Sequence, residues 1–184
     1  MAPEQTPPAK EPTQVPYQPR SAAPAFETLV PTNMQTAVTD ALDNLEQRVG
    51  NLDDYVARQL HIESTEQLHD RFGAEQVDAL ALAFSNLDQN QGFIIGDQTG
   101  VGKGRFVAAV IEHTRQQGLV PIFITQTPEL YGDMFRDLED IGVSDLNPLL
   151  TNDSLNVVLP SGGALTTKSA SILRSLPDWT LKSL

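Results

Sequence analysis

The chain has 184 residues, enough for one domain with appended segments but not for two large hydrophobic cores. It contains no cysteine, which excludes disulfide bonds and thiolate metal sites, and its three histidines lack the spacing of metal ligands. A net charge of −12 and a pI near 4.5 argue against a free-standing nucleic-acid-binding protein, because such proteins present a basic face. No apolar run approaches the ~20 residues that span a membrane, and the N-terminus lacks the apolar segment of a signal peptide, so we expect a cytoplasmic protein without a membrane partner.

The first half of the chain is expected to contain a tail and a group of helices. Residues 1–31 hold eight of the thirteen prolines and little aliphatic content, which predicts a disordered Pro-rich tail. Residues 32–90 are expected to form an α-helical lead-in. The first expected helix begins at Thr32, which acts as its cap, and ends before Gly50. The second covers about residues 52–60. The third begins with a capping box of Ser64 and Gln67 and ends at Gly73, and the fourth covers about residues 74–87.

From residue 91 the pattern changes to alternating strands and helices. Strands are predicted at residues 93–95, 120–125 and 155–159, and helices at residues 103–117 and from Thr127 to about residue 140. This βαβαβ order implies a parallel sheet with ligands at the carboxyl ends of its strands. The expected fold is therefore α/β, with residues 91–184 forming an incomplete P-loop NTPase lobe of the RecA-like type behind the helical lead-in.

The run Gly96–Arg105 carries the clearest functional signal. It lies between a predicted strand and a predicted helix, where glycines allow the backbone amides to surround a phosphate and the helix N-terminus adds positive charge. Lys103 is expected to contact the β- and γ-phosphates and to act as the catalytic electrostatic stabiliser. The expected nucleotide-binding residues in this run are Asp97, Gln98, Thr99, Gly100, Val101, Gly102, Lys103, Gly104 and Arg105.

The run departs from the standard P-loop pattern at two positions. Asp97 occupies the place of the first glycine, and Gly104 occupies the place of the Ser or Thr that binds Mg²⁺. Mg²⁺ is therefore expected only indirectly, through the nucleotide, and no protein metal site is predicted. Asp97 either holds a water on Mg²⁺ or caps the turn, and Arg105 either contacts phosphate or faces solvent. A glycine-rich turn that carries a lysine by chance is the alternative.

The string Gly-Asp-x-x-Gly-Val-Gly-Lys-Gly-Arg resembles the strawberry-notch group of superfamily-two helicase-like ATPases, which includes large phage and plasmid antirestriction proteins. The resemblance covers about residues 26–160 and suggests a bacterial, phage or plasmid origin. It implies that ATP or ADP is bound and that DNA is a partner only of a longer parent protein. It also implies that Gln76, 26 residues before Gly102, recognises adenine, a task that suits a carboxamide because it donates and accepts at once.

Two parts of a helicase motor have no counterpart in the sequence. An apolar strand ending in Asp-Glu, which holds Mg²⁺ and the attacking water, is missing, since Asp137, Glu139 and Asp140 lie at a predicted helix end. A second RecA-like lobe is missing too. We therefore expect the N-terminal part of an ATP-dependent helicase-like NTP hydrolase, inactive by itself. The alternative is a non-catalytic assembly module that docks onto a larger protein complex and carries a vestigial P-loop.

Overall fold

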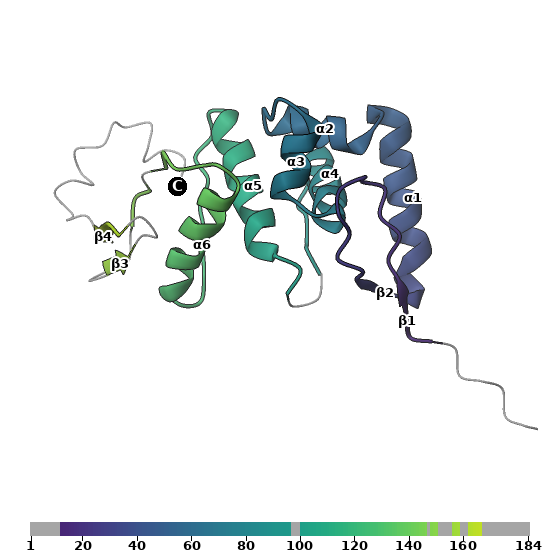
Figure 1. Cartoon of the computed structure of the whole chain (residues 1–184), viewed down its shortest axis with the longest axis horizontal. Helices are drawn as coiled ribbons and strands as arrows, with labels where there is room; N and C mark the ends of the chain where they lie inside the picture. The colour runs from purple at the N-terminus through teal and green to yellow at the C-terminus, as the bar shows by residue number, and fades with distance from the viewer. Residues whose placement is uncertain (1–11, 97–99, 147, 151–155, 159–161, 167–184) are drawn as a thin grey trace, which may run out of the picture. The chain divides into compact units, whose positions relative to one another are not determined.

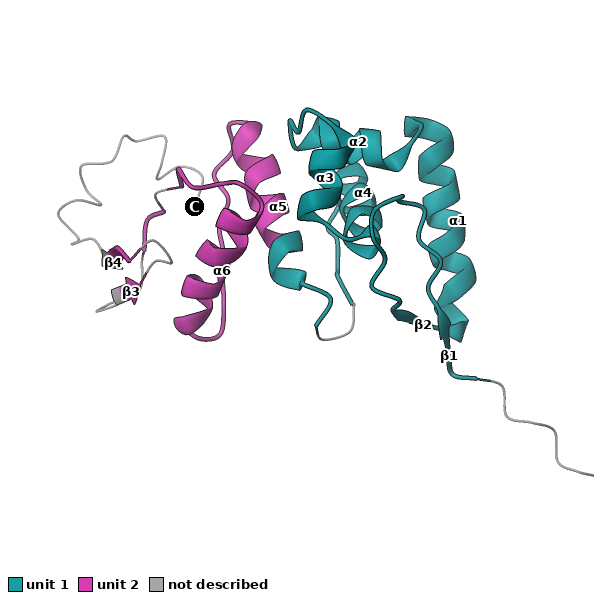
Figure 2. Ribbon diagram, in the orientation of Figure 1, with its two compact units in different colours: residues 1–106 teal, residues 107–184 magenta. Residues whose placement is uncertain are grey.

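The computed structural model describes residues 12–96, 100–146, 148–150, 156–158 and 162–166. The chain divides into two compact units, residues 1–106 and residues 107–184 (Figure 2). Across the described residues the regular structure is mostly helical, with two antiparallel two-stranded sheets. The division predicted from the sequence, with boundaries after residues 31 and 90, is based on composition and motifs and stays a prediction.

The first unit is built on helices α1 to α4 (Figure 1). Their bounds are Thr32–Val49 for α1, Leu52–Gln59 for α2, Thr65–Arg71 for α3 and Ala74–Asp88 for α4. Helix α4 packs against α1 and α2, and α2 packs against α3. The core is formed by apolar side chains at helical spacing, with Leu42, Leu45, Leu52, Val56, Leu68, Val77, Leu80 and Phe84 all buried. The helices predicted for residues 32–88 are confirmed.

The ends of these helices are fixed by different groups. Ser64 caps α3, as predicted, because its hydroxyl accepts a hydrogen bond from the backbone amide of Gln67 at 3.3 Å. The prediction that Thr32 caps α1 is wrong. Pro31 precedes the helix, and the Thr32 hydroxyl instead donates to the carbonyl oxygen of Pro12 at 2.6 Å.

Residues 12–31, which we call the N-terminal strap, have a defined structure. Strands β1, Gln14–Pro16, and β2, Leu29–Pro31, pair antiparallel with Val15 opposite Val30. The sequence predicted a disordered tail over residues 1–31. Residues 1–11 lie outside the described residues. For residues 12–31 the prediction is wrong, because the strap is bound to the helices. Backbone amides of the strap donate to carboxylates on α2 and α4, which are partners far away in the sequence. Proline content alone does not reveal such partners.

The second unit contains most of helix α5 and the elements that follow it. Helix α5 spans Lys103–Gln116 and α6 spans Glu129–Asp140. Strands β3, Asn156–Val158, and β4, Ala164–Thr166, pair antiparallel, and α6 packs against β3.

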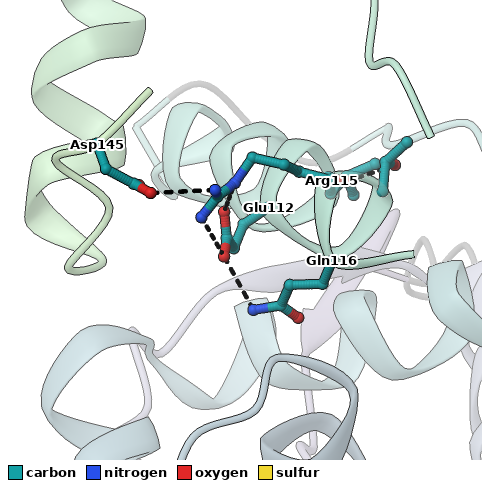
Figure 3. Close-up of polar contacts among 6 residues, drawn as sticks. Glu112, Arg115, Gln116 and Asp145 are labelled. Atoms are coloured by element: carbon teal, nitrogen blue, oxygen red, sulfur yellow. Dashed lines mark hydrogen bonds and ion pairs between the residues drawn. The ribbon is translucent and has the colours of Figure 1, made fainter. Parts of the chain in front are cut away.

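A polar cluster holds the end of α5 in this second unit (Figure 3). The buried carboxylate of Glu112 accepts from Nε and Nη2 of Arg115, at 2.8 and 3.0 Å, and from Nε2 of Gln116 at 2.9 Å. Nη1 of Arg115 donates to Asp145 at 3.1 Å, in the segment after α6. The charge of Glu112 is thereby neutralised within the unit, as a buried carboxylate requires.

The parallel sheet predicted from the sequence is not formed within the described part of the chain. Residues 93–95 and 120–125 run without strand pairing, and the predicted third strand, residues 155–159, corresponds to β3, which pairs antiparallel with β4. A strand needs a neighbour for its amide and carbonyl groups, and an apolar run does not say whether one is present. Ile94 and Ile124 accordingly remain 93% and 85% exposed.

None of the helices that the structure describes is both long enough and apolar enough to cross a membrane.

Candidate nucleotide-binding site

Three segments of the first unit meet around the glycine-rich loop. They are the start of α4, the described end of the loop at residues 100–102, and the first turn of α5. Hydrogen bonds from a single side chain, that of Gln76, join the first two segments, and the backbone of Gly102 joins the loop to α5. Residues that the sequence separates by about 26 positions are thereby brought into contact.

The described end of the loop contains two glycines with positive φ. Gly100 has φ +100° and Gly102 has φ +72°, whereas Val101 between them is not among the residues with positive φ. Positive φ is strained for any residue with a Cβ, so both positions favour glycine. Alternation of positive and negative φ along a loop is a feature of backbone nests, in which successive amide groups can bind an anion.

Helix α5 begins at Lys103, as the sequence predicted. The carbonyl oxygen of Gly102 accepts from the backbone amides of Arg105 at 3.1 Å and Phe106 at 3.4 Å, which closes the first turn of the helix. Lys103 and Gly104 are half-buried at this helix N-terminus. An anion bound before Lys103 would face both the positive end of the helix dipole and the lysine ammonium group.

Gln76 lies in the first turn of α4 and is 5% exposed. Its Oε1 accepts from the backbone amide of Gly73 at 3.0 Å, which satisfies an amide at the start of the helix. Its Nε2 donates to the carbonyl oxygens of Val101 and Gly102, both at 3.0 Å. Gln76 therefore contacts the backbone of the loop in the structure, while its predicted contact with adenine stays a prediction.

The remaining predicted site residues have mixed outcomes. Nη1 of Arg105 donates to the carbonyl oxygen of Arg71 at the end of α3, at 3.2 Å, a contact that neither of its two predicted roles included. A role of Arg105 toward phosphate stays a prediction. Asp97, Gln98 and Thr99 lie outside the described residues, so the choice between a water on Mg²⁺ and a capped turn for Asp97 stays open.

The sequence analysis missed the contribution of the N-terminal strap to this region. The backbone amide of Phe26 donates to both carboxylate oxygens of Glu75, at 2.9 and 3.0 Å, directly beside Gln76 in the sequence. The ring of Phe26, 47% exposed, lies against Gly73 so closely that a Cβ on Gly73 would overlap it. The only signal in the sequence was Phe26 itself, a large apolar residue near the end of the Pro-rich segment.

Asp78 anchors the strap two residues after Gln76. Its carboxylate accepts from the backbone amides of Arg20 at 2.8 Å and Ser21 at 2.9 Å, and from the hydroxyl of Tyr17 at 2.8 Å. Burial raises the pKa of Asp78 above its ordinary value, and these three hydrogen bonds oppose the rise because they favour the charged form. The strap thus depends on a buried acid of α4.

The described residues contain no group of three His, Cys, Asp or Glu side chains able to hold a metal ion. Gly104 also provides no hydroxyl after Lys103, where P-loops bind Mg²⁺.

Comparison with known proteins agrees with this geometry. The sequence profile of the family described as P-loop containing NTP hydrolase pore-1 matches residues 61–161, more than half of the chain. The chain belongs to this family. The matched range contains Gln76, the glycine-rich loop and the whole of α5 and α6, so the P-loop NTP hydrolase pore-1 region spans the candidate site.

One relative is Protein FORGETTER 1 of Arabidopsis thaliana, which is 37% identical over 95 residues. The alignment covers 46% of this chain and 7% of FORGETTER 1, so the chain spans a small part of that relative. No solved structure matches the chain.

Proposed function

We propose that this chain binds ATP or ADP, together with Mg²⁺, at the loop before α5. The observation that carries the proposal is the positive φ of Gly100 and Gly102 directly before Lys103, at the start of a helix in a family of P-loop NTP hydrolases. Lys103 pairs with the β- and γ-phosphates, and the amides of the loop and of the first turn of α5 surround them. Mg²⁺ would be held mainly by the nucleotide and would offset part of its phosphate charge.

The wider proposal concerns the parent protein. The Gly-Asp-x-x-Gly-Val-Gly-Lys-Gly-Arg string supports membership of the strawberry-notch group of helicase-like ATPases, and FORGETTER 1 is a relative over 95 residues. We propose that residues 93–95 and 120–125 are strands of a RecA-like parallel sheet in the parent. Their exposed apolar side chains, including Ile94 and Ile124, support this proposal because such side chains are normally covered. Hydrolysis and DNA binding belong to the parent protein.

Isothermal titration calorimetry with Mg²⁺–ATP and Mg²⁺–ADP tests nucleotide binding. Lys103→Ala removes the proposed phosphate contact, and Arg58→Ala is a matched control that removes one positive charge from an exposed position on α2. We expect binding by the wild type and by Arg58→Ala, and a loss of at least about tenfold in affinity for Lys103→Ala, since a hydrogen bond to a charged group contributes about 1.5–3 kcal/mol. Equal affinity in all three proteins would refute the role of Lys103. Absence of binding in the wild type would refute the proposal and favour the assembly module with a vestigial P-loop.

A further inference from the structure

The hydrogen-bonding groups of the Gln76 side chain have partners within the first unit. Oε1 accepts from Gly73, and the two protons of Nε2 go to the carbonyl oxygens of Val101 and Gly102, each at 3.0 Å. A carboxamide has two donor protons, so both are used. The side chain is also 5% exposed, which leaves little of it accessible from solvent.

This arrangement conflicts with recognition of a base in the free protein. To recognise the edge of adenine, a carboxamide donates to N7 and accepts from the N6 amino group. Oε1 of Gln76 retains a second lone pair, but Nε2 has no proton left to donate. Gln76 therefore contacts N7 only after releasing the carbonyl of Val101 or of Gly102.

Gly102 gives independent evidence that the amide and the loop fit closely. A Cβ at this position would collide with Nε2 of Gln76. The carbonyl of Gly102 also accepts from the backbone amides of Arg105 and Phe106, so the bond from Gln76 reaches the group that starts α5. A hydrogen bond that holds this carbonyl therefore also holds the backbone of Gly102, the residue directly before Lys103.

We propose that Gln76 is a positioning residue that holds the phosphate loop in shape from the first turn of α4. It acts through the carbonyls of Val101 and Gly102 and therefore on the phosphate end of the ligand, with equal effect for every base. The inference rests on the proposed function in one respect, namely that the loop it holds binds phosphate.

Gln76→Glu is the sharpest test because it is nearly isosteric. A carboxylate oxygen still accepts from Gly73, so the helix start is preserved, but the other oxygen faces two carbonyl oxygens and repels them. Gln76→Met removes all three hydrogen bonds without adding a charge. Gln47→Glu, at an exposed position on α1, is the matched control for the added charge.

Two measurements use these variants of the full chain. Hydrogen–deuterium exchange of the nucleotide-free protein follows the amides of residues 100–105, with those of α1 and α2 as internal references. Calorimetric titration compares inorganic tripolyphosphate, ATP and GTP, each with Mg²⁺. We expect both Gln76 variants to exchange about tenfold faster at residues 100–105 only, as loss of one or two hydrogen bonds requires. We also expect all three ligands to bind weaker by the same factor, about tenfold.

Unchanged exchange at residues 100–105 would overturn the proposal, as would equally faster exchange in α1 and α2, which would show a general structural role. An effect on ATP alone, with tripolyphosphate and GTP unchanged, would also overturn it and show that Gln76 recognises adenine instead. If the wild type binds none of the three ligands, the proposed function fails. The exchange measurement in the free protein still decides whether Gln76 holds the loop.

Discussion

Gly102→Ala tests the contact between the phosphate loop and Gln76 by stability alone. The substitution has two costs that the structure separates. An alanine at φ +72° costs about 1–2 kcal/mol of backbone strain. Its Cβ also displaces Nε2 of Gln76, and the two hydrogen bonds lost contribute about 1 kcal/mol each. The expected total is about 3–4 kcal/mol.

The two costs are resolved by a double-mutant cycle with Gln76→Ala. In the Gln76→Ala background no amide is present to be displaced, so Gly102→Ala keeps only its strain, and the expected coupling is about 2 kcal/mol. Gly50→Ala is the matched control, because Gly50 has φ +81° with nothing within 4 Å of an added Cβ. Its cost is expected to be the same in both backgrounds.

The free energies of unfolding are measured by urea denaturation followed by far-UV circular dichroism. A cost of Gly102→Ala that agrees in the two backgrounds within about 0.5 kcal/mol would refute the reasoning, since independent sites are additive to that extent. It would mean that the hydrogen bonds between Gln76 and the loop are not made in solution.

Three further predictions concern the strap. Asp78→Asn replaces one carboxylate oxygen by an amide group and so removes the acceptor of at least one of its three hydrogen bonds; it should lower the free energy of unfolding by about 2–4 kcal/mol. Asp43→Asn, which breaks an exposed ion pair with Arg20, should cost below about 1 kcal/mol. Equal losses in urea denaturation would show that the strap is not anchored at Asp78. Because the folded-state pKa of Asp78 is raised, its stabilising contribution is complete below the ordinary aspartate pKa and is lost as the pH rises through the folded value. The stability difference between wild type and Asp78→Asn should therefore narrow with rising pH across the acid range, and a widening difference would contradict the direction of the shift. Gly73→Ala should lower the free energy of unfolding by about 1 kcal/mol, because the added Cβ pushes aside the ring of Phe26. In a Phe26→Ala background, thermal denaturation should show no such loss.

The helices could be predicted because their signals are local. Leu42 and Leu45 repeat at helical spacing, and Ser64 carries the cap of α3 in its own side chain. The strap could not be predicted, since its order depends on carboxylates such as Asp78, 57 positions away from Ser21. The expected strands at residues 93–95 and 120–125 differ from the structure for a related reason. An apolar run shows that a segment favours burial, but not which neighbour pairs with it.

The site was predictable where it rests on local chemistry. Gly100 and Gly102 adopt the positive φ expected of a glycine-rich phosphate loop, and α5 starts at Lys103. A role of Gln76 in recognising adenine was inferred from a family resemblance, and it stays a prediction. Its hydrogen bonds to two loop carbonyls were not expected, because a sequence shows that a carboxamide is present but not which partners it selects.

The central claim is that the loop before α5 binds the phosphates of a nucleotide. Two-dimensional ¹H–¹⁵N NMR during titration with Mg²⁺–ADP tests it most directly. We expect the amide resonances of Gly100, Gly102 and Gly104 to shift together and to saturate with one dissociation constant, while those of α1 stay unchanged. Saturating shifts elsewhere that leave these three glycines unmoved, or no shift at millimolar Mg²⁺–ADP, would contradict it.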